Sequence, residues 1–302
     1  MTRTLTSFAV ACLAAALLTG CYESHPGTAT PVDPTDDGGI PMPPPPPPPP
    51  PPPAGDGTFV VSSLRLPAPT GGRAPGVDLD GIDSREGSVD PSATCEEFVP
   101  DFTSLHGGEP GVDNAWVELA PTFESLIGAS YDELLAERIA AGDLLLGVRL
   151  EGADASLVAL SPTGPLRLDG DGRPVAGQRF EVVEVLAGGV RSPAGDRERV
   201  TLEGPLRLPG VDMFLPLLPI AQLSRAQLEY RVAPVGLLEG ELGGVVDVEL
   251  AVALIASFMP GIEDTVRSIL ESVADIDPGP EPQVCEGLSI GMAFDAVPAE
   301  LE

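Results

Sequence analysis

Three aspartates in the first half of the chain have a spacing that could bind a cation. Asp78 and Asp80 come before Gly81, and Asp83 comes two residues after it. Calcium takes about six to eight oxygen ligands, and alternating carboxylates on a loop bent by glycine supply them. The spacing differs from that of an EF-hand loop, in which glycine stands sixth and glutamate twelfth. The pattern predicts either a calcium site of another kind or turn carboxylates that are simply solvated.

The surrounding stretch is acidic enough to complete such a site. Residues 78–118 contain eleven acidic residues and one basic residue, Arg85. Glu109, Asp113 and Asn114 offer further oxygen ligands from the same region. A second acidic run, Asp169–Gly172, is instead typical of a hairpin turn, because Asp-Gly is a strong turn signal.

One serine lies in a motif that is used in nucleophilic catalysis. Gly287–Gly291 matches G-x-S-x-G, which presents a nucleophile between a strand and a helix and requires a later histidine. Here Ser289 lies in a strand-like alternation, and the residues after Gly291 include no histidine. His106 is the one histidine in the predicted folded region. The sequence therefore favours a protein without catalytic residues; a hydrolase that uses Ser289 or a pair of acidic residues is the alternative.

The first twenty residues have the pattern of a secretory signal. Arg3 and the α-amino group make the start positive, and Phe8–Leu18 is an apolar run of eleven residues. Such a run is too short for a helix to cross about 30 Å of hydrocarbon. Small residues follow it, as they do before a cleavage site.

The end of this segment, Leu18-Thr19-Gly20-Cys21, resembles the lipobox of bacterial lipoproteins, L-[AST]-[GA]-C. The resemblance implies that residues 1–20 are removed and that Cys21 receives a diacylglycerol and a further acyl chain such as palmitate. Two or three acyl chains hold a protein stably on a membrane. In this family an aspartate after the cysteine disfavours the outer membrane. Tyr22 stands there, so the resemblance implies the cell envelope and its outer membrane, without implying an activity.

Two cysteines remain once Cys12, in the signal, and Cys21 are set aside. Cys95 and Cys285 would be a pair in an oxidising compartment, which predicts a disulfide. In the chain-entropy model, closing so long a loop contributes about 4–5 kcal/mol to stability. The bond would join the start of the folded region to its end, which favours one domain.

Charge excludes several partners. The formal net charge is −30, and all sixteen basic residues are arginine. Such a surface repels nucleic-acid phosphates and anionic lipid headgroups. The absence of lysine excludes a nucleotide phosphate loop and a Schiff base. The expected partners are therefore a membrane, through the lipid anchor, and a protein or glycan ligand that the sequence does not specify; nucleic acid is not expected.

Composition divides the remaining chain into two parts. Residues 21–56 lack hydrophobic periodicity, and Pro43–Pro53 is an unbroken proline run. A proline run adopts the polyproline II conformation at about 3.1 Å per residue, so it predicts a semi-rigid stalk. Residues 57–302 then form a single acidic domain.

The pattern within this domain is mostly that of β-structure. Strand patterns lie at 58–66, 144–150, 156–160, 179–186, 199–203, 211–218, 226–232 and 288–296. A capping box at Ser130 and Glu133 begins a helix, and residues 262–273 form an amphipathic one. The run 245–258 fits a helix or a strand. We expect a mostly β fold, an antiparallel sandwich or open barrel with two or three helices; an α+β fold is the alternative.

Overall fold

The computed structural model describes residues 55–83, 101–208, 222–258, 260–278 and 285–302. All of these lie in the second of two compact units, Pro50–Glu302. The lipobox with Cys21, the proline run, Cys95 and the predicted strand at 211–218 lie outside the described residues. The expectations that depend on them therefore stay predictions.

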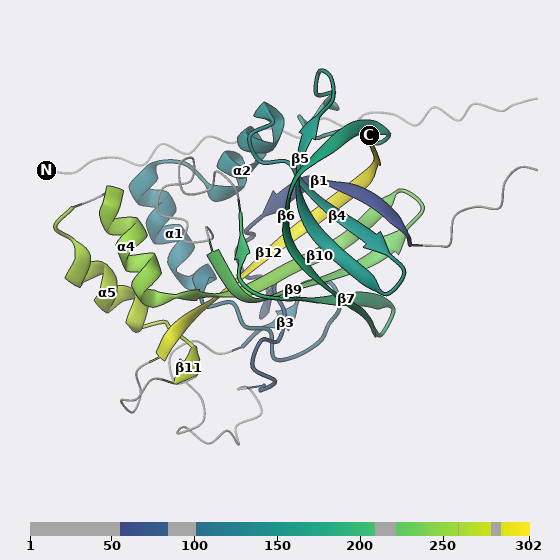
Figure 1. Ribbon diagram of the computed structural model, residues 1–302. Helices are drawn as coiled ribbons and strands as arrows, with labels where there is room; N and C mark the ends of the chain where they lie inside the picture. Colours follow the sequence, from purple (N-terminus) through teal and green to yellow (C-terminus); the bar gives the residue numbers. More distant parts are fainter. Residues whose placement is uncertain (1–54, 84–100, 209–221, 259, 279–284) are drawn as a thin grey trace, which may run out of the picture. The chain divides into compact units, whose positions relative to one another are not determined.

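Eight strands form a closed antiparallel barrel (Figure 1). In order around the barrel they are β1 (Gly57–Arg65), β4 (Leu146–Glu151), β5 (Asp154–Pro162), β6 (Gln178–Ala194), β7 (Arg197–Leu202), β9 (Gln222–Ala233), β10 (Gly236–Asp247) and β12 (Cys285–Leu301). The first and last strands pair, with Val60 opposite Val297, so the sheet closes on itself. The mostly β, antiparallel prediction is confirmed, and the barrel is closed.

Short strands and helices complete the described part of the domain. The short strands are β2 (Arg73–Ala74), β3 (Thr103–Ser104), β8 (Leu206–Arg207) and β11 (Ile276–Pro278). The helices are α1 (Trp116–Ile127), α2 (Tyr131–Ala141), α4 (Val248–Phe258) and α5 (Glu263–Glu271). The described residues thus contain four helices, which contact β1, β10 and β12. Among these residues, no helix has the length and apolar character needed to cross a membrane.

Local sequence signals fix where two of the helices, α2 and α4, begin. Ser130 and Glu133 form the expected capping box of α2, and Gly142 ends the helix in the left-handed conformation. Residues 245–258, whose sequence fits a helix or a strand, contain both: β10 continues to Asp247, and α4 follows at once. The Asp247 carboxylate accepts a hydrogen bond from the Leu250 N–H, which satisfies a free donor in the first turn of α4.

Strand β9 shows the alternation that its sequence predicts. Ala226, Leu228 and Tyr230 are buried in the core. The same alternation predicts that Glu229 faces water, but Glu229 is also buried, because the segment that follows β3 covers this face of the sheet. Arg199 on β7 pairs with Glu229 and also with Glu109 of that segment, 3.0 Å away. A salt-bridged chain segment therefore replaces water over part of the barrel wall.

Candidate cation site

A pair of glycines lets a loop lie flat on the outside of the barrel. Gly243 on β10 and Gly291 on β12 are register partners. A Cβ atom at Gly291 would lie 2.1 Å from the Pro75 carbonyl oxygen, and one at Gly243 would lie 2.5 Å from Cγ2 of Val77. Only glycines allow so close an approach of two backbones. The loop that carries Asp78 and Asp80 thus starts from a fixed position.

A second segment is fastened to this loop. The Asn114 side-chain amide donates to the Pro75 carbonyl (2.6 Å) and to the Gly291 carbonyl (3.2 Å). The Asp113 N–H donates to the Val77 carbonyl at 3.2 Å. Asn114 is buried, so these bonds form away from water, where breaking them is costly. They bring Asp113 next to the predicted acidic loop.

The segment before Asp113 is held by a buried charge network. Glu241 on β10 is fully buried and accepts hydrogen bonds from the Ser104 hydroxyl (3.0 and 3.1 Å) and the His106 N–H (3.0 Å). The Arg197 guanidinium lies 3.6 Å from the same carboxylate. Removing one partner of such a pair leaves the other charge buried and uncompensated. Both ends of the segment 104–114 are therefore fixed to the barrel.

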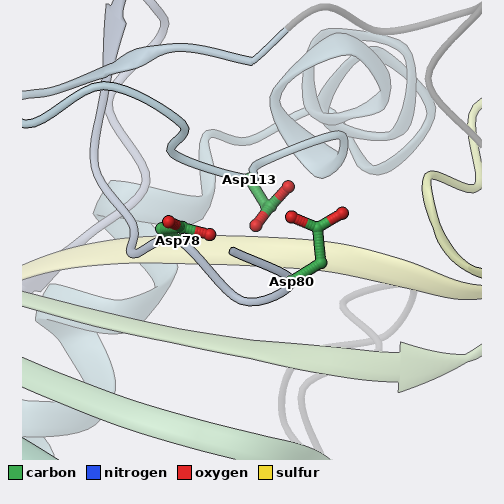
Figure 2. A group of neighbouring side chains, drawn as sticks. All are labelled: Asp78, Asp80 and Asp113. Atoms are coloured by element: carbon green, nitrogen blue, oxygen red, sulfur yellow. The ribbon is translucent and has the colours of Figure 1, made fainter. Parts of the chain in front are cut away.

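Three carboxylates meet where the two segments touch. Ligand oxygens of Asp78, Asp80 and Asp113 all lie within 4.8 Å of one another. Figure 2 shows the Asp113 carboxylate between those of Asp78 and Asp80. Asp113 is buried, whereas Asp78 and Asp80 are half-buried. We call these three residues the acidic cluster.

The acidic cluster has oxygens left for a ligand. Backbone N–H groups occupy one oxygen of each residue: Gly81 donates to Asp78 (2.6 Å), Ile82 to Asp80 (2.9 Å) and Leu79 to Asp113 (2.6 Å). A carboxylate offers about four lone-pair sites, so these hydrogen bonds leave capacity to bind a cation, with water completing the coordination. Calcium accepts such irregular oxygen shells, whereas magnesium demands a near-ideal octahedron.

Without a cation, burial and mutual repulsion disfavour the charged forms of the three carboxylates in the acidic cluster. Burial, together with the nearby charges of Asp80, Asp275 and Asp101, raises the pKa of Asp113 to about 10, although the hydrogen bond from the Leu79 N–H opposes the shift. Burial also raises the pKa values of Asp78 and Asp80, although backbone hydrogen bonds oppose the shift. At neutral pH a proton therefore resides on Asp113, and a divalent cation would have to displace it.

A fourth carboxylate lies buried nearby. Asp275 follows α5 and accepts hydrogen bonds from the Ser289 N–H (2.9 Å) and the Ser289 hydroxyl. The Ser289 oxygen in turn accepts the Ala115 N–H at 2.7 Å. Burial raises the pKa of Asp275 to about 7, although its bonds with Ser289 oppose the shift. The strand β12 is thus joined through Ser289 to the segment that carries Asp113.

This arrangement accounts for the G-x-S-x-G match. Ser289 is fully buried within β12, and the strand continues on both sides of it. Its hydroxyl bridges Asp275 and Ala115. Burial lowers the pKa of the His106 imidazole, and the nearby charge of Arg197 lowers it further. The structure therefore places Ser289 in the wall of the barrel, where it connects elements.

The other predicted residues have separate positions. Asp83 acts electrostatically on Asp78 but is not among the three residues of the acidic cluster. Glu109 pairs with Arg199 instead of joining the cluster. Asp169–Gly172 forms the predicted turn, in which the Asp169 carboxylate accepts the N–H groups of Asp171 and Arg173, both at 2.9 Å. Cys285 is buried at the start of β12. Its disulfide with Cys95 stays a prediction, because Cys95 lies outside the described residues.

Comparison of the chain with protein-family models, with curated proteins and with solved structures finds no match. The function must therefore be inferred from the residues of this chain.

Proposed function

We propose that this chain is a lipid-anchored protein of the cell envelope whose β-barrel domain serves binding, with a divalent cation, calcium by its ligand type, held at the acidic cluster. The observation that carries the binding part is the convergence of Asp78, Asp80 and Asp113 within 4.8 Å. The three aspartates offer carboxylate oxygens, one of them from a buried residue, and oxygen ligands suit a hard cation. The bound cation would lower the repulsion among these acids and hold the two segments together.

The anchoring part of the proposal depends on the lipobox. Leu18–Cys21 closes the apolar run, and a proline-rich stretch separates Cys21 from the first barrel strand. A semi-rigid stalk of this composition would hold the acidic domain away from a negatively charged bilayer surface, which repels it. The proposed location is the outer membrane.

Cys21→Ser should abolish lipid attachment, because serine has no thiol for the diacylglycerol to modify. In cells fed a clickable palmitate analogue, the native chain should carry label and Cys21→Ser should not. Cys12→Ser is the matched control, since it removes a cysteine from the apolar run and should keep the label. Label retained on Cys21→Ser would contradict the anchor.

A hydrolase receives less support from the geometry. The bridging role of the buried Ser289 hydroxyl leaves it without access to a substrate. A nucleophilic serine needs a base within hydrogen-bond reach, and the nearest side chain that bonds Ser289 is a carboxylate, Asp275. The close acidic residues instead form a group of three, which favours a cation.

A further inference from the structure

A small cavity lies between the residues that follow β1 and the helices α1 and α2. The apolar part of its lining includes Leu66, Val117 and Ala120, which are almost fully buried. Two carboxylates, those of Glu124 on α1 and Asp132 on α2, also line it. The volume of the cavity is about 200 Å³. An apolar recess with a few convergent polar groups is the usual form of a ligand-binding site.

The backbone holds both carboxylates in place. Asp132 accepts a hydrogen bond from the Leu66 N–H at 2.6 Å, and Glu124 accepts one from the Tyr131 N–H at 2.8 Å. Each of these bonds uses one acceptor site, whereas a carboxylate offers about four. Both carboxylates therefore keep acceptor capacity for a ligand at fixed positions.

The negative charge of this pair is not balanced. Among the residues that the structure describes, no cationic side chain forms an ion pair with Glu124 or Asp132. Both residues are half-buried, so water solvates their charges only in part. The N-terminal end of α2 offsets about half a unit of negative charge, which leaves more than one unit. A positively charged ligand would complete the balance.

The size and the apolar lining of the cavity restrict the kind of cation. A water molecule occupies about 30 Å³ in the liquid, so the cavity has room for about six or seven heavy atoms. A bare metal ion would leave the apolar lining without a contact. An alkylammonium of this size places its chain against the apolar residues and its three N–H donors at the carboxylates.

We propose that this cavity binds a primary ammonium group on an unbranched chain of four or five carbons, supplied by a free alkylamine or by the lysine side chain of another protein. The chain contains no lysine, so no side chain of its own carries this group. The site is separate from the acidic cluster and does not depend on a metal ion.

Saturation-transfer difference NMR of the full-length protein with n-pentylamine, at physiological ionic strength, tests the proposal. Methylamine has the charge without the chain, and 1-pentanol has the chain without the charge, so each should bind about tenfold more weakly than pentylamine. Nα-acetyl-lysine N-methylamide separates the two sources. Binding as tight as that of pentylamine identifies a lysine side chain of another protein, whereas binding of pentylamine alone identifies a free amine.

Two substitutions remove the charges and keep the backbone contacts. Asp132→Asn and Glu124→Gln each retain an oxygen for the N–H group that they accept, and each should weaken pentylamine binding about fivefold to tenfold. Glu133→Gln is the matched control, because it removes a charge from the same turn of α2 at a residue that does not line the cavity. Its effect should stay below about twofold, since exposed charges are screened by salt.

Thermal melting of each variant confirms that it is folded. Equal affinities for pentylamine and methylamine would show that the protein attracts any cation, and equal affinities for pentylamine and pentanol would show that the carboxylates play no part. Either result would overturn the proposal. Absence of saturable pentylamine binding, or equal effects of Asp132→Asn and Glu133→Gln, would overturn it as well.

Discussion

Without divalent cations, the free energy of unfolding should fall as the pH rises from about 4 to 8. The folded-state pKa of Asp275 is raised from 3.8 to about 7, so the protonated form favours folding. Its contribution is fully present below about pH 4 and is lost as the pH rises through 7. A pKa shift of this size corresponds to about 4 kcal/mol in the free energy of unfolding. Asp113 contributes to the same fall from about pH 4 and extends it to about pH 10, since its pKa is raised from 3.8 to about 10.

Asp275→Asn should remove this part of the pH dependence, because asparagine is neutral throughout. Urea denaturation between pH 4 and 8 should give a visibly flatter curve for Asp275→Asn than for the native chain. Asp171→Asn, at an exposed turn carboxylate, is the matched control and should keep the native slope. The same slope in the native chain and in Asp275→Asn would show that Asp275 ionises as easily in the folded state as in the unfolded one.

Gly291→Ala should destabilise the barrel strongly, although it adds only one methyl group. The new Cβ would lie 2.1 Å from the Pro75 carbonyl oxygen and 2.7 Å from Cα of Gly76. Backbone atoms on both sides must move, at a cost of about 3 kcal/mol, and the melting temperature should fall by about 10 °C. The loop with Asp78 and Asp80 would also shift, so cation binding should be lost with it.

Gly188→Ala is the matched control for this substitution. Gly188 also lies in a barrel strand, but a Cβ atom there meets nothing within 4 Å. Its melting temperature should stay within about 2 °C of the native value. Thermal melting of the two variants side by side checks the prediction. Equal stabilities would mean that the loop does not rest on the Gly243–Gly291 pair.

Much of the fold could be predicted because it depends on local periodicity. The alternation in β9 and the capping box of α2 are properties of adjacent residues. The closure of the barrel is not, since it requires β1 to pair with β12 at the other end of the domain. The burial of Glu229 could not be predicted either, because the segment that covers it comes from a distant part of the sequence.

The acidic cluster, too, could be predicted only in part from the sequence. Asp78 and Asp80 could be predicted as a pair from their spacing, and Asp113 was one of several acids that could complete the site. Only the bridge between Val77 and Asp113 and the amide of Asn114 decide which acid does so. Asp275 had no signal in the sequence, because it reaches this region through the packing of α5 and β11 against β12.

The most direct test of the proposed cation site is thermal melting of the full-length protein in millimolar CaCl₂, in MgCl₂, and in NaCl of equal ionic strength. Binding to the folded state alone stabilises it by about 2.7 kcal/mol at a hundredfold excess over Kd. Salt screening should raise stability only slightly and without preference among cations. The proposed cation site predicts a calcium-specific rise in melting temperature that is lost in Asp80→Asn and kept in Asp171→Asn. Equal shifts in all three salts would contradict it.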